Sequence, residues 1–181
     1  MDVFSHGLWG GIAFGRRSRR SFWTALAIGM APDVIAFGPF MAKRLLTQGT
    51  GFFSHLGHKP ALATIPEYVH SVYHVTHSLV VFALVFGLVW AIRGKPMIEM
   101  LAWGLHVCMD IPFHSNAFFP THFLWPLSDF HVNGIPWSRP YIFFPDWGLL
   151  IIVYTWYFWG RRRAKVQMQA DPQPDPPDDA K

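Results

Sequence analysis

Histidines spaced for one face of a helix are the first feature of the sequence that could do chemistry. Glu67, His70, His74 and His77 are separated by three, four and three residues. In a helix this spacing places all four side chains on one face, where imidazoles one turn apart can share a metal ion. We expect His74 and His77 to be ligands, whereas a solvated position at a membrane interface is the better explanation of His70.

A second group combines two histidines with an aspartate inside an apolar run. His106, Asp110 and His114 follow one another at intervals of four residues. On an unbroken helix the outer pair would be ~12 Å apart, too far to share one ion. Either Asp110 bridges two ions, or Pro112 breaks the helix and lets His114 turn back. An ionisable group in a membrane segment costs about 2.5–3.5 kcal/mol and needs a partner, which a metal or a histidinium would supply.

Asp33 is a third candidate ligand, because it follows Pro32 inside another apolar stretch. An alternative is that Pro32 breaks a helix and Asp33 caps the next one. The insertion cost applies here too, and no lysine or arginine lies nearby in the sequence to pair with the carboxylate. We therefore favour a ligand role for Asp33.

The loop over residues 118–137 is dense in aromatic residues and proline, which is typical of a rigid lid at a membrane interface. Its His122, Asp129 and His131 could each add a ligand, a general acid or a substrate contact. Taken singly, each is more often a solvated loop residue. Asp146 just beyond the loop is expected to cap the last helix.

The composition favours a membrane protein with one domain. Of the 181 residues, 51% are hydrophobic and 14% charged, against about 25% charged in soluble domains. The net charge of +4 sits in short clusters beside apolar segments, so we expect no nucleic-acid partner. Residues 1–165 form the predicted membrane domain. Residues 166–181, acidic and rich in proline, form a tail expected to be disordered.

Four apolar segments must position the candidate residues: 22–40, 75–92, 97–113 and 147–160. Each is at or slightly below the ~20 residues that a helix needs to cross a bilayer. Residues 3–14 are shorter and rich in glycine, and could be re-entrant, a short crossing or a helix packed against the others. The expected fold is an all-α, membrane-embedded bundle of four to five short transmembrane helices.

Basic clusters indicate the orientation of this bundle. Lysine and arginine collect on the cytoplasmic side of short loops, and alternate threading of the four segments puts residues 16–20, 93–95 and 161–165 on one side. Only Lys43 and Arg44 fall on the other. The expected location is the plasma or inner membrane, with a cytoplasmic C-terminus and the candidate ligands toward the outer face.

The sequence resembles the predicted membrane-bound metal-dependent hydrolases. The resemblance covers most of the chain before Arg161. It rests on Ser5-His6-Gly7, Ala31-Pro32-Asp33, the Tyr-His-Val-Thr-His-Ser element at 73–78, and the segment from His106 to His114 with its following loop.

That last segment, His106-x3-Asp110-Ile111-x2-His114, is remotely similar to the zinc-ligand segment of zinc-dependent phospholipase C and its single-strand nuclease relatives. Those helical enzymes cleave phosphoesters at a multinuclear zinc site. The similarity implies that Asp33, His74 or His77, and His6 complete the site. The sequence departs from that pattern because it has no second His-x3-Glu element after His114 and no N-terminal tryptophan ligand.

We expect hydrolysis at one or more divalent metal ions, most simply zinc, which would lower the pKa of bound water toward ~7. The expected substrate is a small molecule or a lipid, in particular a phosphoester such as a lipid headgroup. Membrane lipids are the other expected partners, and the sequence leaves the oligomeric state open. Asp110 and His114 are the candidate catalytic residues. The candidate metal ligands are Asp33, His74, His77, His106 and Asp110, with His114 and His6 as second choices.

Two other classes of function suit parts of the sequence. A metal or proton transporter would use intramembrane aspartates and histidines as a relay, with polar residues spread across the membrane depth. A structural membrane protein without catalysis would hold no stoichiometric metal, and His77→Ala would then leave metal content and stability unchanged.

Overall fold

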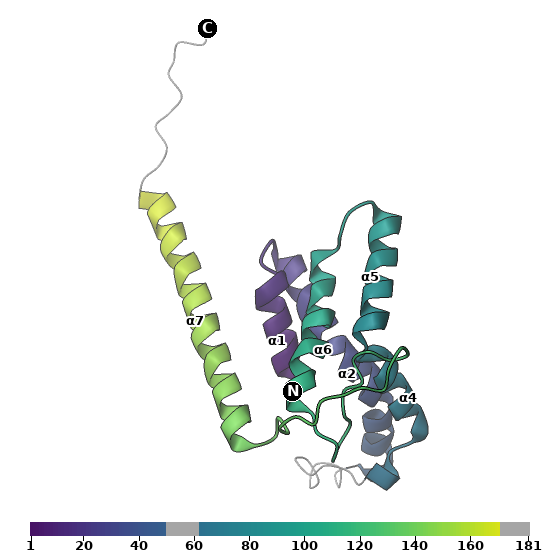
Figure 1. The fold of residues 1–181 in the computed structure, drawn as a ribbon. Helices are drawn as coiled ribbons and strands as arrows, with labels where there is room; N and C mark the ends of the chain where they lie inside the picture. Colours follow the sequence, from purple (N-terminus) through teal and green to yellow (C-terminus); the bar gives the residue numbers. More distant parts are fainter. Residues whose placement is uncertain (50–61, 171–181) are drawn as a thin grey trace, which may run out of the picture.

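The computed structural model describes residues 1–49 and 62–170, and these ranges contain helices but no β-strand. The all-α expectation is thereby confirmed. Figure 1 shows the α-helices side by side. Two short 3-10 helices, η1 (Leu62–Thr64) and η2 (Ile98–Met100), precede α4 and α6 along the chain. The six α-helices are α1 (Val3–Phe14), α2 (Arg19–Gln48), α4 (Glu67–Thr76), α5 (Leu79–Arg93), α6 (Leu101–Phe113) and α7 (Pro140–Ala170).

Helix α1 packs against α2 and α6, which agrees with the expected alternative that residues 3–14 form a helix packed against the others. Glycines make this close approach possible. A Cβ on Gly10 would lie 2.8 Å from the Cβ of Ala102, and one on Gly29 of α2 would lie 2.8 Å from the carbonyl oxygen of His6. The small-residue contacts bring the backbone of α1, and with it His6, directly against α2 and α6.

Helix α2 continues without a break through Pro32 and Pro39, so Asp33 is not a cap after a break. A proline removes one backbone hydrogen bond from a helix, but tertiary packing holds α2 together here. Ala36 and Phe40 of α2 are buried in a core that also contains Val69 and Tyr73 of α4. This packing fixes α2 and α4 relative to each other on the side of the bundle where Asp33 lies.

The apolar segment expected over residues 75–92 is not one straight helix. Helix α4 ends at Thr76, α5 begins at Leu79, and the two are bent by 57°. Ser78 starts the second helix, because its hydroxyl accepts hydrogen bonds from the backbone N–H groups of Val80 and Val81, each at 3.1 Å. The break places His77 at a corner, with a direction different from that of a residue inside a regular helix.

The lengths of the helices support fewer membrane crossings than expected. In the described part of the chain, only α2 and Pro140–Gly160 of α7 are long and apolar enough to span a membrane, and the bent pair α4–α5 would make a third. Helices α1 and α6 have 12 and 13 residues, or roughly 20 Å of length, against a hydrocarbon core of about 30 Å. A bundle of four to five crossings is therefore not confirmed.

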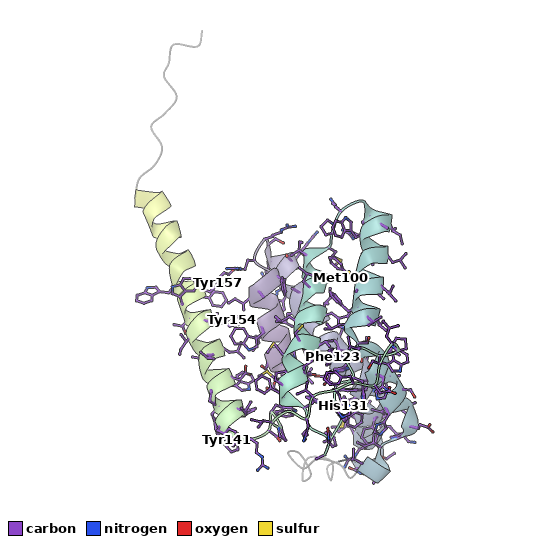
Figure 2. The ribbon with its side chains drawn as sticks, in the orientation of Figure 1. Met100, Phe123, His131, Tyr141, Tyr154 and Tyr157 are labelled. Carbon is purple, nitrogen blue, oxygen red and sulfur yellow. The ribbon has the colours of Figure 1, made fainter. Side chains whose placement is uncertain are left out.

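Helix α7 is attached to the rest of the bundle through α1. Asp146 accepts hydrogen bonds from Ser5 Oγ at 2.5 Å and from Trp9 Nε1 at 2.8 Å. The hydroxyl of Tyr154, which lies between the two helices in Figure 2, donates to the carbonyl of Leu8 at 2.8 Å. Asp146 does not cap a helix as expected, since α7 begins well before it; it joins two helices instead.

The irregular segment 114–139 closes one end of the bundle. The backbone N–H of Leu79 donates to the carbonyl of Phe123 at 2.9 Å, and Ser78 donates to the carbonyl of Trp125. In Figure 2 His131 lies near the lower end of α6, whereas Met100 lies at its upper end. The segment is therefore anchored at the α4–α5 corner.

Figure 1 shows the α1–α2 turn, the α5–α6 turn and the C-terminal part of α7 at the end of the bundle opposite the 114–139 segment. These three places carry the basic residues 16–20, 93–95 and 161–165. One part of the sequence prediction falls outside the described residues: the tail from residue 171 onward. Residues 166–170 of the expected tail belong to α7.

Candidate metal centre

Four buried side chains from three parts of the chain form a group that could bind a metal ion: Asp33 of α2, His77 at the α4–α5 corner, and His106 and Asp110 of α6. One nitrogen or oxygen of each lies within 4.8 Å of those of the others. His77, His106 and Asp110 are at most 1% exposed, and Asp33 is 7% exposed.

The distances between these atoms match those of a tetrahedral site. His77 Nε2 lies 3.4 Å from Asp33 Oδ1 and 3.5 Å from Asp110 Oδ2. His106 Nε2 lies 3.9 Å and 3.3 Å from the same two oxygens, and the two Nε2 atoms are 3.0 Å apart. Ligands about 2.0–2.1 Å from a tetrahedral zinc ion are roughly 3.3 Å from one another. The four atoms therefore surround a point at about metal-ligand distance from each.

The other nitrogen of each histidine is held by a backbone carbonyl. His77 Nδ1 lies 3.1 Å from the carbonyl oxygen of Tyr73, and His106 Nδ1 lies 2.7 Å from that of Gly29. A carbonyl oxygen only accepts, so we assign the proton of each ring to Nδ1. Nε2 then carries a lone pair directed at the centre, which is the tautomer of most metal-bound histidines.

These tautomers leave four electron-rich atoms facing one another without a hydrogen between them. Two imidazole lone pairs and two carboxylates would repel one another at 3.0–3.9 Å unless a metal ion or an added proton lies among them. Aromatic neighbours hold the rings in place: Tyr73 stacks on His77 and His6 stacks on His106, both with centroids 3.7 Å apart. The arrangement is thus rigid and suited to a cation.

Asp110 also faces a second set of groups through its other oxygen. Oδ1 lies 2.9 Å from His6 Nε2 and 3.4 Å from His114 Nε2, and it contacts the amino group of Met1. His114 Nδ1 lies 2.8 Å from the carbonyl oxygen of Phe119, so the same tautomer assignment directs its Nε2 inward. His114 Nε2 and His6 Nδ1 are buried without a hydrogen-bond partner. Asp110 therefore connects the four-residue group to two further histidines.

The expected helix break at Pro112, which would let His114 turn back, does not occur. Helix α6 runs through Pro112 to Phe113, and His114 follows in an extended conformation. His106 faces Oδ2 and His114 faces Oδ1 of the Asp110 carboxylate. Asp110 therefore bridges the distance between the two histidines, which is too long for both to bind one ion.

A small pocket lies beside His114. Its walls are mostly aromatic, and it is lined by Phe113, His114, Ser115, Phe118, Pro136 and Trp137. Its position at the 114–139 segment gives a water-sized group from that end of the bundle a place next to His114, whose Nε2 is itself buried and faces Asp110.

The remaining predicted residues lie elsewhere. His74 is not part of the four-residue group; its ring contacts that of His122, with centroids 4.7 Å apart. The expectation that His74 and His77 share an ion does not match this arrangement, because the helix ends between them at Thr76. His70 stacks on Phe119. Asp129 and His131 belong to the 114–139 segment.

Sequence reasoning missed two supporting groups. The carbonyl of Gly29 orients His106, and no side chain signals this role. Tyr73 orients His77 through its carbonyl and its ring, and its hydroxyl lies 3.1 Å from His114 Nδ1. The four-residue spacing of Tyr73 and His77 could have indicated that pair.

Comparison with known proteins gives no relative: no family model, no curated protein and no solved structure matches the chain. The chemistry of the site is therefore the basis for a function.

Proposed function

We propose that the protein is a membrane-bound hydrolase that uses a divalent metal ion, most simply zinc, held by Asp33, His77, His106 and Asp110. The observation that carries the proposal is that each Nε2 atom lies 3.0–3.9 Å from the other and from an oxygen of each carboxylate, with both Nδ1 atoms held by carbonyls. Zinc accepts imidazole nitrogen and carboxylate oxygen, and it can expand from four to five ligands when water or substrate binds.

A bound zinc ion would lower the pKa of a water molecule and stabilise charge on the attacked group. The residues of the chain supply the rest of the site. Asp33 is the most exposed of the four ligands, so water would enter the site on the side of Asp33. His114 Nε2, which carries the lone pair in the assigned tautomer, would accept a hydrogen bond from a water molecule or a hydroxyl group of the substrate. The pocket has room for a water-sized group only, so the adjoining part of the molecule would lie outside it.

A phosphoester at the membrane surface is the substrate class we propose. The pocket lies at the 114–139 segment, opposite the basic ends of the helices. With those basic ends in the cytoplasm, the pocket lies at the outer surface of a multi-pass protein of the plasma or inner membrane. Phospholipid headgroups occupy that level of the bilayer.

The metal is tested first. Protein purified in detergent with a histidine-free affinity tag is analysed for metal by elemental mass spectrometry. We expect about one tightly held ion per chain in the wild type and less than a tenth of that in His77→Gln. His70→Gln is the matched control, because His70 lies on the same helix but stacks on Phe119. Equal metal in His77→Gln and wild type would contradict the site.

Hydrolysis is tested with a chromogenic phosphodiester, bis(p-nitrophenyl) phosphate, and with phospholipid vesicles. Activity should require the metal, disappear with a chelator, return with Zn²⁺, and be absent from His77→Gln. Metal binding without hydrolysis of either substrate class would retain the centre and contradict the proposed phosphoesterase. If the Nε2 atoms of His77 and His106 instead share a proton, as in a proton relay, neither the wild type nor any variant would contain metal.

A further inference from the structure

A second group of histidines lies outside the metal centre, where α4 meets the 114–139 segment. The ring of His122 lies between those of His74 and His131, with centroid distances of 4.7 Å and 4.6 Å. In a tetrahedral zinc site, neighbouring imidazole centroids are about 5 Å apart. The nitrogens of the three rings do not all lie within 4.8 Å of one another in the structure, so the rings would have to rotate to direct one nitrogen of each toward a common point.

The hydrogen bonds of this group resemble those of metal-binding histidines. His131 Nδ1 lies 3.0 Å from the carbonyl oxygen of Asp129, so the ring donates there and Nε2 carries the lone pair. Nε2 now lies 3.1 Å from Asn116 Oδ1, an exposed amide that could turn its NH₂ group toward the ring or give way to an ion. His122 Nδ1 is buried and has no hydrogen-bond partner.

We propose that His74, His122 and His131 form a second site that binds a divalent transition-metal ion such as Zn²⁺. This site is separate from the centre of the proposed hydrolase and does not depend on that activity.

The protonation of the cluster favours a cation over an anion. Burial lowers the pKa of His122, and the neighbouring His131 lowers it further. The middle ring is therefore neutral at pH 7 and has a lone pair available, as metal binding requires. A phosphate or other anion would instead require protonated rings in mutual contact.

The site would join two parts of the fold. His74 comes from α4, whereas His122 and His131 come from opposite ends of the aromatic part of the 114–139 segment. An ion bound to all three would cross-link this segment to α4. Its binding free energy would then stabilise the segment that carries the pocket beside His114.

Metal stoichiometry tests the proposal in the full chain with a histidine-free tag. At saturating Zn²⁺, we expect the wild type to bind one more ion than His122→Gln or His131→Gln. His70→Gln should bind as many ions as the wild type. His77→Gln should lose only the inner ion, so that failure of one site is distinguishable from failure of the other. Equal stoichiometry in wild type, His122→Gln and His131→Gln would overturn the proposal.

A measurement on the wild type alone removes the effect of misfolding in a variant. Diethyl pyrocarbonate modifies unbound imidazoles, and mass spectrometry locates the modified residues. Zn²⁺ should reduce modification of His122 and His131 at least several-fold and leave His70 unaffected. Unchanged modification of His122 and His131 with Zn²⁺ present would contradict the second site.

Discussion

Asp110 is the residue on which both halves of the metal centre depend. Its Oδ2 faces His77 and His106, and its Oδ1 faces His6 and His114. It is fully buried. A carboxylate in this position neutralises any cation bound on either side, so its removal affects more contacts than the removal of any single histidine.

Asp110→Asn keeps the shape of the side chain and removes its charge. We expect the metal content to fall below a tenth of the wild-type value and the protein to be destabilised by about 3–5 kcal/mol, the usual cost of breaking a buried ionic contact. Asp33→Asn should lose metal to a similar extent with a smaller loss of stability, because Asp33 faces two of the histidines, whereas Asp110 faces four. Elemental analysis and thermal melting in detergent measure both quantities. Full metal content in Asp110→Asn would exclude Asp110 as a ligand.

His114→Gln separates metal binding from the reaction. His114 is not one of the four converging ligands, and it lines the pocket. We expect the inner ion to remain and kcat/KM for the phosphodiester to fall about 100-fold, the effect of losing one positioned group at a reacting centre. Steady-state kinetics on metal-loaded protein measure the change, with His70→Gln as the unaffected control. Wild-type kinetics in His114→Gln would exclude contact between His114 and the substrate.

At the scale of the helices, the position of α1 depends on Gly29. This residue lets the backbone of His6 approach α2 and offers its own carbonyl to His106. The same glycine therefore serves the helix packing and the orientation of a ligand.

Gly29→Ala should displace α1, because the added Cβ would lie 2.8 Å from the carbonyl oxygen of His6. We expect a lower melting temperature and less than half of the wild-type metal. Gly38→Ala in the same helix is the matched control, since its Cβ would meet only Val34 Cγ1, at 3.7 Å. The control should be neutral or more stable by up to about 1 kcal/mol, the helix propensity of alanine over glycine. An equally stable, metal-replete Gly29→Ala would contradict this account of the packing.

The sequence predicted the helical class and singled out each residue of the converging group, because aspartates and histidines inside apolar segments need partners. It did not predict which partners meet. His74 and His77 have the spacing of one helical face, but the helix bends between α4 and α5, and the bend depends on the cap at Ser78 and its contact with Trp125. The supporting carbonyls could not be predicted, because every residue has the same backbone carbonyl and the sequence does not distinguish one from another.

The lengths of the helices also differ from those that the sequence predicted. Residues 97–113 read as one apolar segment, yet a 3-10 turn precedes α6 and shortens the helix to 13 residues. Hydrophobicity alone does not distinguish a short interior helix from a membrane crossing.

At the scale of the whole molecule, the basic ends and the 114–139 segment lie at opposite ends of the bundle. Single cysteines test whether a membrane separates them. In a Cys108→Ser background, Ser138→Cys should react with a membrane-impermeant maleimide on intact cells. Lys95→Cys, at the α5–α6 turn, should react only after the cells are opened. Each variant is the control for the other, and labelling of both in intact cells would contradict the proposed orientation.

Asp33 lies within α2, a helix long enough to cross the membrane, whereas His77 and His106 come much later in the chain. If α2 crosses the membrane, it meets the lipid during synthesis before any of its partners exists, carrying a lone carboxylate that costs about 2.5–3.5 kcal/mol to insert. The carboxylate gains its full set of partners only when the ribosome has completed α6. A chain truncated before His106 should consequently leave α2 poorly integrated and open to quality-control proteases.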